Sequence, residues 1–182
     1  MLGVARNKVA LAPHDDAWAS EYRLAADQLM GIIGDNIIEI HHVGSTAIKG
    51  IAAKPILDIA IVIKNVEILN VSGMEAAGYE YRGDAGVPGR HFFVRRVNGE
   101  ISTHHVHCYL EGNDNYESLV LFAGFLNANP EYARQYNDLK LELARQFPDD
   151  RGAYGEAKTA FIEKVAVLAR AEECNKLCKR QA

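Results

Sequence analysis

Residues 41–58 read HHVGSTAIKGIAAKPILD and place a Gly-Ser-Thr turn, two lysines and one aspartate between apolar runs. The last of these residues, Asp58, lies within the run ILDIAIVI at 56–63, which is nearly all apolar and rich in β-branched residues. Such a run is typical of a strand that is covered on both faces. A carboxylate in so apolar a strand is costly unless it is paired, hydrogen-bonded or bound to a cation. The stretch therefore predicts a polar site beside a buried strand, although backbone N–H groups or a nearby lysine would also satisfy Asp58.

The turn before this strand contains a glycine and two hydroxyl side chains, in Gly44, Ser45 and Thr46. A glycine allows close approach of the backbone, and hydroxyls with free N–H groups can form an anion-binding concavity. An ordinary strand-to-helix turn, with Ser or Thr as the helix cap, is the competing interpretation. Lys49 and Lys54 supply compact cations that suit phosphate. We expect Lys49 to lie in solvent, and Lys54, just before the strand, to face the site.

A second polar stretch, STHHVHCYL at 102–110, contains three histidines. If this stretch is a strand, His105 and His107 share one face because successive side chains alternate. Two imidazoles two residues apart on one face can chelate one metal ion. A hydrogen-bonded polar core would explain the same pair. Ligand, catalytic and structural roles therefore stay open for these two histidines on this pattern alone.

Further polar residues are candidates for the same site. Arg90 lies at a loop-to-strand junction, where it could clamp a phosphate with two hydrogen bonds or remain a surface arginine. Tyr154 and Lys158 lie one helical turn apart and would face either the pocket or solvent. His41 and His42 point to opposite sides of one strand. We expect His42 at the pocket because it shares a face with the glycine of the turn.

The rest of the chain contains clear signals for an α+β fold. Asn98-Gly99 lies between two alternating runs and predicts a hairpin, because a type I′ turn requires φ > 0 at both central residues. We expect residues 91–97 to pair antiparallel with 101–110. Apolar periodicity, caps and helix breakers predict the other elements: strands at 37–43 and 56–63, and helices at 16–33, 65–77, 116–127, 131–146 and 154–173. This order predicts a mixed sheet followed by a C-terminal helical portion.

Composition limits the classes of function. The chain has 182 residues, of which 48% are hydrophobic and 24% charged, so it can form the core of one domain. Its net charge of −4 argues against a general nucleic-acid binder. Cys108, Cys174 and Cys178 are an odd number without a disulfide pattern, so we expect free thiols and a cytoplasmic protein. No apolar run approaches the length of a membrane span, and no membrane partner is expected.

Together these motifs resemble the GrpB-like family, which is regarded as having a nucleotidyltransferase-like fold. The resemblance covers nearly the whole chain and rests on HHVGSTAIKGIAAKPILDI, GYEYRG, VPGRHFF, THHVHCY and FPDDRGAYGEAKTAFIEKV. It implies a single domain over residues 1–182, with an α/β core at 1–112 and helices at 113–182. It also implies that the strand bearing the paired histidines lies beside the strand bearing Asp58.

Nucleotidyltransferases combine a Gly-Ser turn with a strand of the form Asp-x-Asp or Asp-x-Glu. The resemblance therefore implies that Asp58 is the first carboxylate, but the second position holds Ala60. Where the superfamily often has a third acid, the candidate strand offers His105 and His107. One aspartate with two imidazoles suits Mn²⁺, Zn²⁺, Fe²⁺ or Ni²⁺ better than Mg²⁺. We therefore expect Asp58, His105 and His107 to hold a divalent metal ion and to be the catalytic residues.

The leading hypothesis is a metal-dependent enzyme of nucleotidyltransferase-like fold that acts on a nucleotide or other phosphorylated small molecule. The substrate would contact eight residues: His42, Gly44, Ser45, Thr46, Lys54, Arg90, Tyr154 and Lys158. A metal-dependent phosphoester hydrolase is a neighbouring hypothesis, in which the ion activates water. The alternative from another class is a non-catalytic sensor of degenerate fold, which binds the phosphorylated ligand without turning it over.

Overall fold

A six-stranded mixed sheet forms the centre of the computed structural model, which describes residues 2–5 and 7–180. The strand order is β2-β3-β6-β5-β4, with β1 paired to β6. The strands are β1 (Val4–Ala5), β2 (Ile37–Val43), β3 (Leu57–Ile63), β4 (Tyr79–Tyr81), β5 (His91–Val97) and β6 (Ile101–Leu110). β3 and β6 pair in parallel and the other neighbours pair antiparallel. The predicted α+β class with a mixed sheet is confirmed, and β1 and β4 are strands that the sequence analysis missed.

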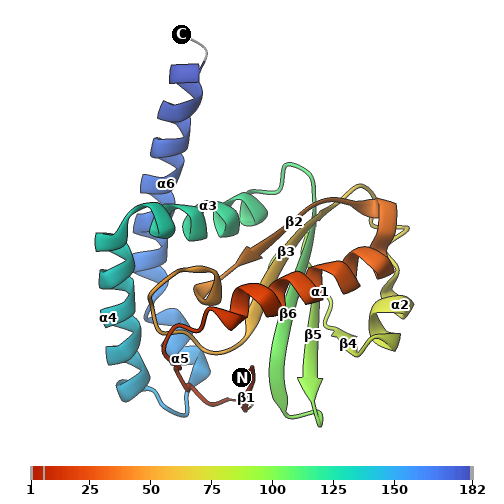
Figure 1. The fold of residues 1–182 in the computed structure, drawn as a ribbon, viewed down its shortest axis with the longest axis horizontal. Helices are drawn as coiled ribbons and strands as arrows, with labels where there is room; N and C mark the ends of the chain where they lie inside the picture. The colour runs from red at the N-terminus through yellow and green to blue at the C-terminus, as the bar shows by residue number, and fades with distance from the viewer. Residues whose placement is uncertain (1, 6, 181–182) are drawn as a thin grey trace.

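The β3 strand is covered on both faces, as its apolar composition predicts. On one face Ile59, Ile61 and Ile63 pack in a buried cluster with residues of α1 (Ala17–Ile33), which lies along the sheet in Figure 1. On the other face Ala60 and Val62 pack in a second cluster with residues of α3 (Asp114–Ala128). Since this second face also bears Asp58, the aspartate lies between the sheet and the C-terminal helices.

The predicted hairpin is present. Asn98 and Gly99 have φ values of 52° and 72°, as a type I′ turn requires. The backbone N–H of Glu100 donates to the Val97 carbonyl at 3.3 Å and closes the turn. The hairpin brings β5 and β6 together and so fixes which face of β6 carries each histidine.

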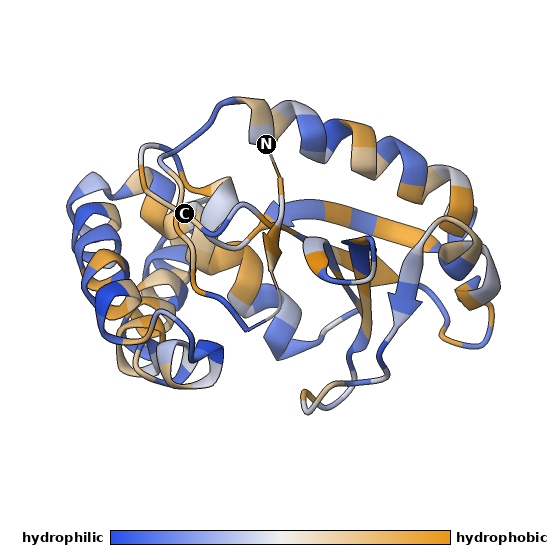
Figure 2. Cartoon of the chain, turned by 90° about the horizontal axis from the view of Figure 1, so that it is seen from below, coloured by the Kyte–Doolittle hydropathy of each residue, from blue (hydrophilic) through white to orange (hydrophobic). Residues whose placement is uncertain are grey.

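The C-terminal helices pack as a group beside the sheet (Figures 1 and 2). They are α3, α4 (Pro130–Gln146), α5 (Arg151–Glu156) and α6 (Thr159–Arg180). A buried cluster joins them to the segment before β3, with Ile48 and Ile51 contacting a core that includes Leu126 of α3 and Val165 of α6. Seen from below, these helices lie to one side and α1 lies along the sheet, with hydrophobic residues concentrated between them (Figure 2).

Two helices differ from the sequence-based expectation. The helix predicted over 65–77 is limited to α2 (Val71–Ala76), because the Asn65 side chain makes a local turn by accepting from the Glu67 N–H at 2.8 Å. Asn70 then caps the short helix, accepting from the Gly73 N–H at 2.9 Å. The helix predicted over 154–173 is broken after Glu156, where residues 157–158 form a turn between α5 and α6.

The thiols and hydropathy agree with the composition analysis. Cys108 is buried, Cys174 and Cys178 are exposed, and all three are free thiols. Among the residues that the structure describes, no helix is both long and apolar enough to span a bilayer.

Candidate functional site

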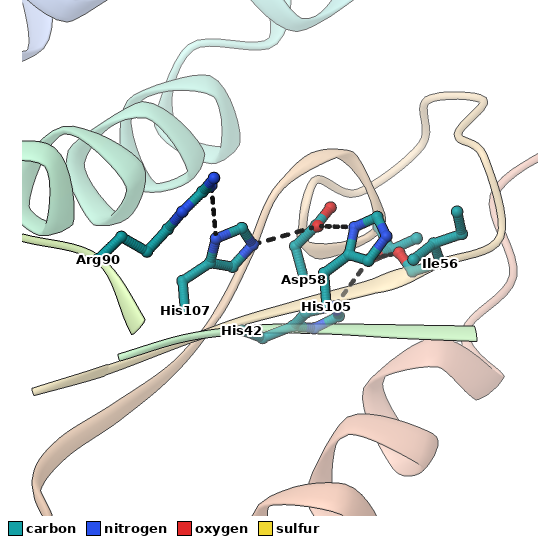
Figure 3. Close-up of polar contacts among 7 residues, drawn as sticks. His42, Ile56, Asp58, Arg90, His105 and His107 are labelled. Carbon is teal, nitrogen blue, oxygen red and sulfur yellow. Dashed lines mark hydrogen bonds and ion pairs between the residues drawn. The ribbon is translucent and has the colours of Figure 1, made fainter. Parts of the chain in front are cut away.

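Parallel pairing of β3 with β6 brings the aspartate and the two histidines together. Asp58 lies opposite His105 and Ala60 lies opposite His107 in the register of the two strands. One oxygen of Asp58, Oδ1, is 3.0 Å from His105 Nδ1 and 3.6 Å from His107 Nε2 (Figure 3). The side chains of Asp58, His105 and His107 retain 29%, 13% and 11% of their exposure. The three form a half-buried polar group in an otherwise apolar part of the sheet, which we call the Asp-His-His triad.

The hydrogen bonds of the triad determine its charge. Burial raises the pKa of Asp58, but the hydrogen bond from His105 and the nearby imidazole of His107 outweigh it and hold that pKa well below its ordinary value. Asp58 is therefore ionised and can only accept hydrogen bonds. Burial lowers the pKa of His105 despite the opposing effect of Asp58, and Arg151 and His107 lower it further. Neutral His105 must donate through Nδ1 to Asp58, which leaves Nε2 as an acceptor.

Arg90 fixes the orientation of the second imidazole. Its Nη1 lies 3.4 Å from His107 Nδ1 (Figure 3). A guanidinium only donates, so His107 Nδ1 is the acceptor and the proton of the neutral ring lies on Nε2, toward Asp58. The remaining guanidinium nitrogens of Arg90 donate to the carbonyls of Asp84 at 3.0 Å and Ala85 at 3.1 Å. Arg90 therefore links a surface loop to the triad.

Position 44, in the turn before β3, requires glycine. Gly44 has φ 70° and ψ −170°, a conformation that side chains disfavour. A Cβ built there would overlap the Asp58 carboxylate and lie 2.8 Å from Asp58 Cβ. The chain can therefore pass directly against the aspartate only because Gly44 has no side chain. Ser45 and Thr46 follow in a short 3₁₀ turn, Ser45–Ala47.

A cavity of about 290 Å³ lies between this turn, the two central strands and the C-terminal helices. Cations line it together with Asp58: Lys54 from the segment before β3, Arg151 from the start of α5, and Lys158 from the turn before α6. The remaining lining residues are Gly44, Ser45, Ile56, His105, Ser118, Leu119, Phe122, Tyr136, Tyr154, Ile162 and Ala166. The lining thus combines three cations, one carboxylate and an apolar portion.

The cations lie close enough to affect one another. Burial, together with the charges of Arg151 and Lys158, lowers the pKa of Lys54 to about 8, although Asp58 opposes them. Burial also lowers the pKa of Lys158, with Asp58 opposing and Arg151 adding to the effect. Both ammonium groups lie near the Tyr154 ring, at 5.3 Å for Lys54 and 4.4 Å for Lys158. An anion in the cavity would relieve this repulsion.

The structure brings together most, but not all, of the residues singled out in the sequence. The cavity is lined by Gly44, Ser45, Lys54, Asp58, His105, Tyr154 and Lys158. His107 reaches the cavity only through Asp58. Arg90 does not line it, because its guanidinium is committed to loop carbonyls and to His107.

Two residues of the predicted substrate set are placed differently from the expectation. The His42 ring stacks on Tyr22 of α1, with ring centroids 4.8 Å apart, and so lies on the other face of the sheet. The chain reverses at Gly44, so sharing a strand face with it does not direct His42 into the cavity. Thr46 is buried and donates to the Ile56 carbonyl at 3.3 Å, while His42 Nε2 donates to Thr46 Oγ1 at 2.9 Å. These two residues support the turn and do not line the cavity.

The sequence analysis missed Arg151, although a signal was present. Arg151, Tyr154 and Lys158 recur at spacings of three and four, so one helical face would have collected all three. Side chains that hold the segment before β3 were missed too. Asn127 of α3 accepts from the Lys49 N–H at 2.9 Å, Asn137 of α4 accepts from the Ala52 N–H at 2.8 Å, and Lys140 donates to the Ala52 carbonyl. Nothing in their own sequence context marks these contacts.

The triad has the residue types of a transition-metal site but not its arrangement. The atoms that would ligate an ion contact each other instead: Asp58 Oδ1 accepts a hydrogen bond from His105 and lies 3.6 Å from His107 Nε2. In the described part of the chain, no group of three or more His, Cys, Asp or Glu side chains is positioned to hold an ion. The three side chains are therefore not positioned as in a preformed metal site. Metal dependence stays a prediction.

Comparison with known proteins places the chain among bacterial relatives. A family model described as GrpB protein matches residues 8–167. Glutamate-rich protein GrpB from Alkalihalophilus pseudofirmus is 34% identical over 170 residues, which cover 91% of this chain and 98% of that protein. UPF0157 protein YqkA from Bacillus subtilis is 37% identical over 160 residues, which cover 87% of this chain. That match spans only 46% of YqkA, so the relative is about twice as long.

A solved structure and two proteins named dephospho-CoA kinase are also similar to this chain. The crystal structure of conserved protein GrpB from Enterococcus faecalis has a TM-score of 0.81 and 31% identity, and the match covers 90% of this chain and 99% of that one. Dephospho-CoA kinase from Mycolicibacterium paratuberculosis is 26% identical over 184 residues, with 87% of this chain and 45% of that protein covered. The similarity therefore extends over the whole fold that carries the cavity.

Proposed function

We propose that this chain, which belongs to the GrpB family, binds a nucleotide or other phosphorylated small molecule in the cavity beside the Asp-His-His triad. The observation that carries the proposal is the charge of the lining. Lys54, Arg151 and Lys158 face one cavity that contains a single carboxylate. Phosphate is the common biological anion that such a group of compact and forked cations recognises.

The electrostatics favour an anionic ligand over an empty cavity. Burial is the main cause of the lowered pKa values of Lys54 and Lys158, and like charges add to it: Arg151 and Lys158 at Lys54, and Arg151 at Lys158. Asp58 opposes these effects at both lysines, but it is a single carboxylate facing three cations. A phosphate group would supply the missing negative charge and accept hydrogen bonds from the three cations.

The size of the cavity supports a small ligand. Its volume of about 290 Å³ lies at the lower end of the range for small-molecule sites, roughly 300–1,000 Å³. A polymer would need an open groove. The name of the kinase relatives refers to a phosphorylated compound, dephospho-CoA, and agrees with a nucleotide-related ligand. Because this chain spans only 45% of those proteins, their kinase activity is not carried over to it.

A second candidate function is catalysis on the bound ligand, and the Asp58–His105 pair favours it. Asp58 holds His105 through Nδ1, and His105 lines the cavity. An imidazole oriented in this way can accept a proton through Nε2 from an attacking water or hydroxyl. Nucleotidyl transfer and phosphoester hydrolysis both require such a step. The absence of a carboxylate at Ala60 separates the site from the usual two-metal arrangement.

Binding is tested by calorimetric titration of inorganic phosphate, AMP and ATP into wild-type protein and Lys54→Ala. We expect Lys54→Ala to weaken binding by about 1–3 kcal/mol, the scale of a lost charge-assisted contact. Lys49→Ala is the matched control, because Lys49 is an exposed lysine outside the cavity lining. Unchanged affinity in Lys54→Ala, or equal loss in both variants, would contradict the proposal.

Catalysis is tested separately by incubating the protein with a mixed pool of nucleotides and following products by chromatography and phosphorus NMR. An enzyme should give turnover that disappears in His105→Ala while phosphate binding persists. Ligand binding without turnover would identify the non-catalytic sensor.

A further inference from the structure

We infer that the ligand is a phosphomonoester whose body is apolar and no larger than one or two rings, seated between α3 and α6 with its phosphate at the cations. The inference rests on the proposed function and specifies the class of ligand. It comes from the part of the cavity that the charged residues do not occupy. There the lining consists of Leu119 and Phe122 from α3 and of Ile162 and Ala166 from α6.

The two parts of the cavity are separated along α6. Lys158 lies in the turn just before α6, and Ile162 and Ala166 follow it at spacings of four on the same helical face. At 1.5 Å per residue, Ala166 lies about 12 Å along the helix from Lys158. Ile162 donates its N–H to the Lys158 carbonyl at 3.1 Å, so the helical path between them is continuous. A ligand anchored at Lys158 would therefore extend its body along the apolar side chains.

The apolar part offers few polar partners to a ligand. Ser118, a lining residue, donates to the Asp114 carbonyl at 2.7 Å and lies 2.6 Å from Arg170 Nη2. Ser45 donates to the Tyr136 hydroxyl at 3.5 Å. Since a hydroxyl has one proton, both serines already use theirs within the protein. A polyhydroxylated body, such as that of a sugar phosphate, would lose hydrogen bonds to water here and recover few.

An apolar body would instead gain contacts. The Phe122 ring packs edge-on against Tyr136, with centroids 5.3 Å apart and an interplanar angle of 85°. Tyr136 in turn stacks on Phe161 at 5.4 Å. The two lining rings are held by each other and by Phe161, so they form a rigid wall. A planar or short aliphatic group that fills the space beside them removes apolar surface from water without ordering new side chains.

The test compares probes that share a phosphate and differ in the body: inorganic phosphate, glycerol 3-phosphate, phenyl phosphate and hexyl phosphate, each titrated by calorimetry. We expect phenyl and hexyl phosphate to bind at least tenfold more tightly than glycerol 3-phosphate, because each buried methylene contributes about fourfold in affinity. Equal affinity for the polar and apolar esters would overturn the inference and leave the phosphate site standing.

Ala166→Leu fills the apolar part from α6 and should abolish the tighter binding of phenyl and hexyl phosphate relative to glycerol 3-phosphate. Ala171→Leu, the same substitution at an exposed position of the same helix, is the control and should retain the preference. If Ala166→Leu does not fold, as judged by circular dichroism and thermal melting, Leu119→Asn makes the same test from α3. An unchanged preference in the folded variant would overturn the inference.

Benzyl alcohol, which has the ring but no phosphate, separates failure of the inference from failure of the proposed function. Saturation-transfer NMR should detect its binding to wild-type protein and to Lys54→Ala, but not to Ala166→Leu. If no phosphorylated probe binds while benzyl alcohol does, the phosphate proposal fails. If benzyl alcohol binds equally to wild type and Ala166→Leu, or does not bind to wild type, the apolar subsite is wrong.

Discussion

At the residue scale, Gly44 shows how closely the turn and the aspartate depend on each other. Its φ of 70° and ψ of −170° disfavour any side chain, and a Cβ would overlap the Asp58 carboxylate. We expect Gly44→Ala to lower the free energy of unfolding by about 1–3 kcal/mol from backbone strain. A carboxylate pushed toward the cations would compete with phosphate for them, so phosphate binding should also weaken. Denaturant titration and calorimetry measure the two effects.

Gly50→Ala separates strain from overlap. Gly50 has a comparable φ of 74°, but a Cβ there would meet nothing within 4 Å. This variant should lose stability and keep phosphate affinity. If both glycine variants bind phosphate as wild type does, contact between the turn and Asp58 is irrelevant to the site.

His42 gives a residue-scale prediction for pH. Burial lowers the pKa of His42 to about 4, with Asp58 opposing the effect. The unfolded chain takes up this proton near pH 6.5, but the folded protein does so only near pH 4. The unfolded state therefore binds more protons in this interval, and the free energy of unfolding should fall by up to about 1.4 kcal/mol per pH unit as pH decreases from 6.5 to 4.

The measurement compares denaturant unfolding of wild type and His42→Gln across this pH range. His42→Gln should show a shallower decline in stability with acid. His41→Gln, which replaces a neighbouring imidazole that keeps 44% of its side-chain exposure, is the control. A decline as steep in His42→Gln as in wild type would show that buried His42 does not titrate between the two states as described.

At the scale of elements, helices α3 and α4 hold the segment that carries Lys54. Asn127 binds both ends of a short stretch, accepting from the Lys49 N–H and donating to the Ala47 carbonyl at 2.9 Å each. Asn137 accepts from the Ala52 N–H, and buried Lys140 donates to the Ala52 carbonyl. The helices thus satisfy backbone groups of a segment that has no ladder of its own.

Removing one of these contacts should affect the site from a distance. In Asn137→Ala the half-buried Ala52 N–H loses its acceptor, and we expect a loss of about 1–3 kcal/mol in the free energy of unfolding. Lys54 lies two residues further on, so phosphate affinity should also fall. Gln135→Ala, which removes a hydrogen bond to exposed Glu131 of the same helix, is the control. Normal stability and affinity in Asn137→Ala would contradict the supporting role.

How well each element could be predicted depended on how local its signal was. Asn98-Gly99 determines the hairpin through its own φ values, and the apolar run at 56–63 determines β3 through burial. The helix expected over 65–77 was wrong for its first half, because asparagine side chains compete locally with helical hydrogen bonds. The break between α5 and α6 was missed because residues 154–173 keep a helical composition through the turn.

At the scale of the whole molecule, the fold creates the site from segments far apart in sequence. The convergence of Asp58 with His105 and His107 could be predicted once β3 and β6 were expected to be neighbours, because strand alternation aims both imidazoles to one face. Helical spacing could have grouped Arg151 with Tyr154 and Lys158, but the position of this group in the cavity depends on how α5 packs against α4. His42 was misplaced for a different reason. It lies opposite Ile59 on the face toward α1, and the chain reverses at Gly44, so this face does not lead to the cavity.

The whole-molecule arrangement also predicts what metal removal does. The cavity cations Lys54, Arg151 and Lys158 come from three separate segments, and none of them needs an ion to contact an anion. We therefore expect phosphate affinity to stay within twofold after exhaustive chelation. The contrary outcome is a tenfold loss of phosphate affinity on chelation that added Mn²⁺ reverses. If the double variant His105→Ala/His107→Ala does not show this loss, an ion completes the ligand site. Calorimetric titration of Zn²⁺, Mn²⁺ and Ni²⁺ into the stripped protein tests the sequence-based metal prediction independently. Ion uptake would require coordination to replace the hydrogen bond from His105 to Asp58 and the close approach of His107.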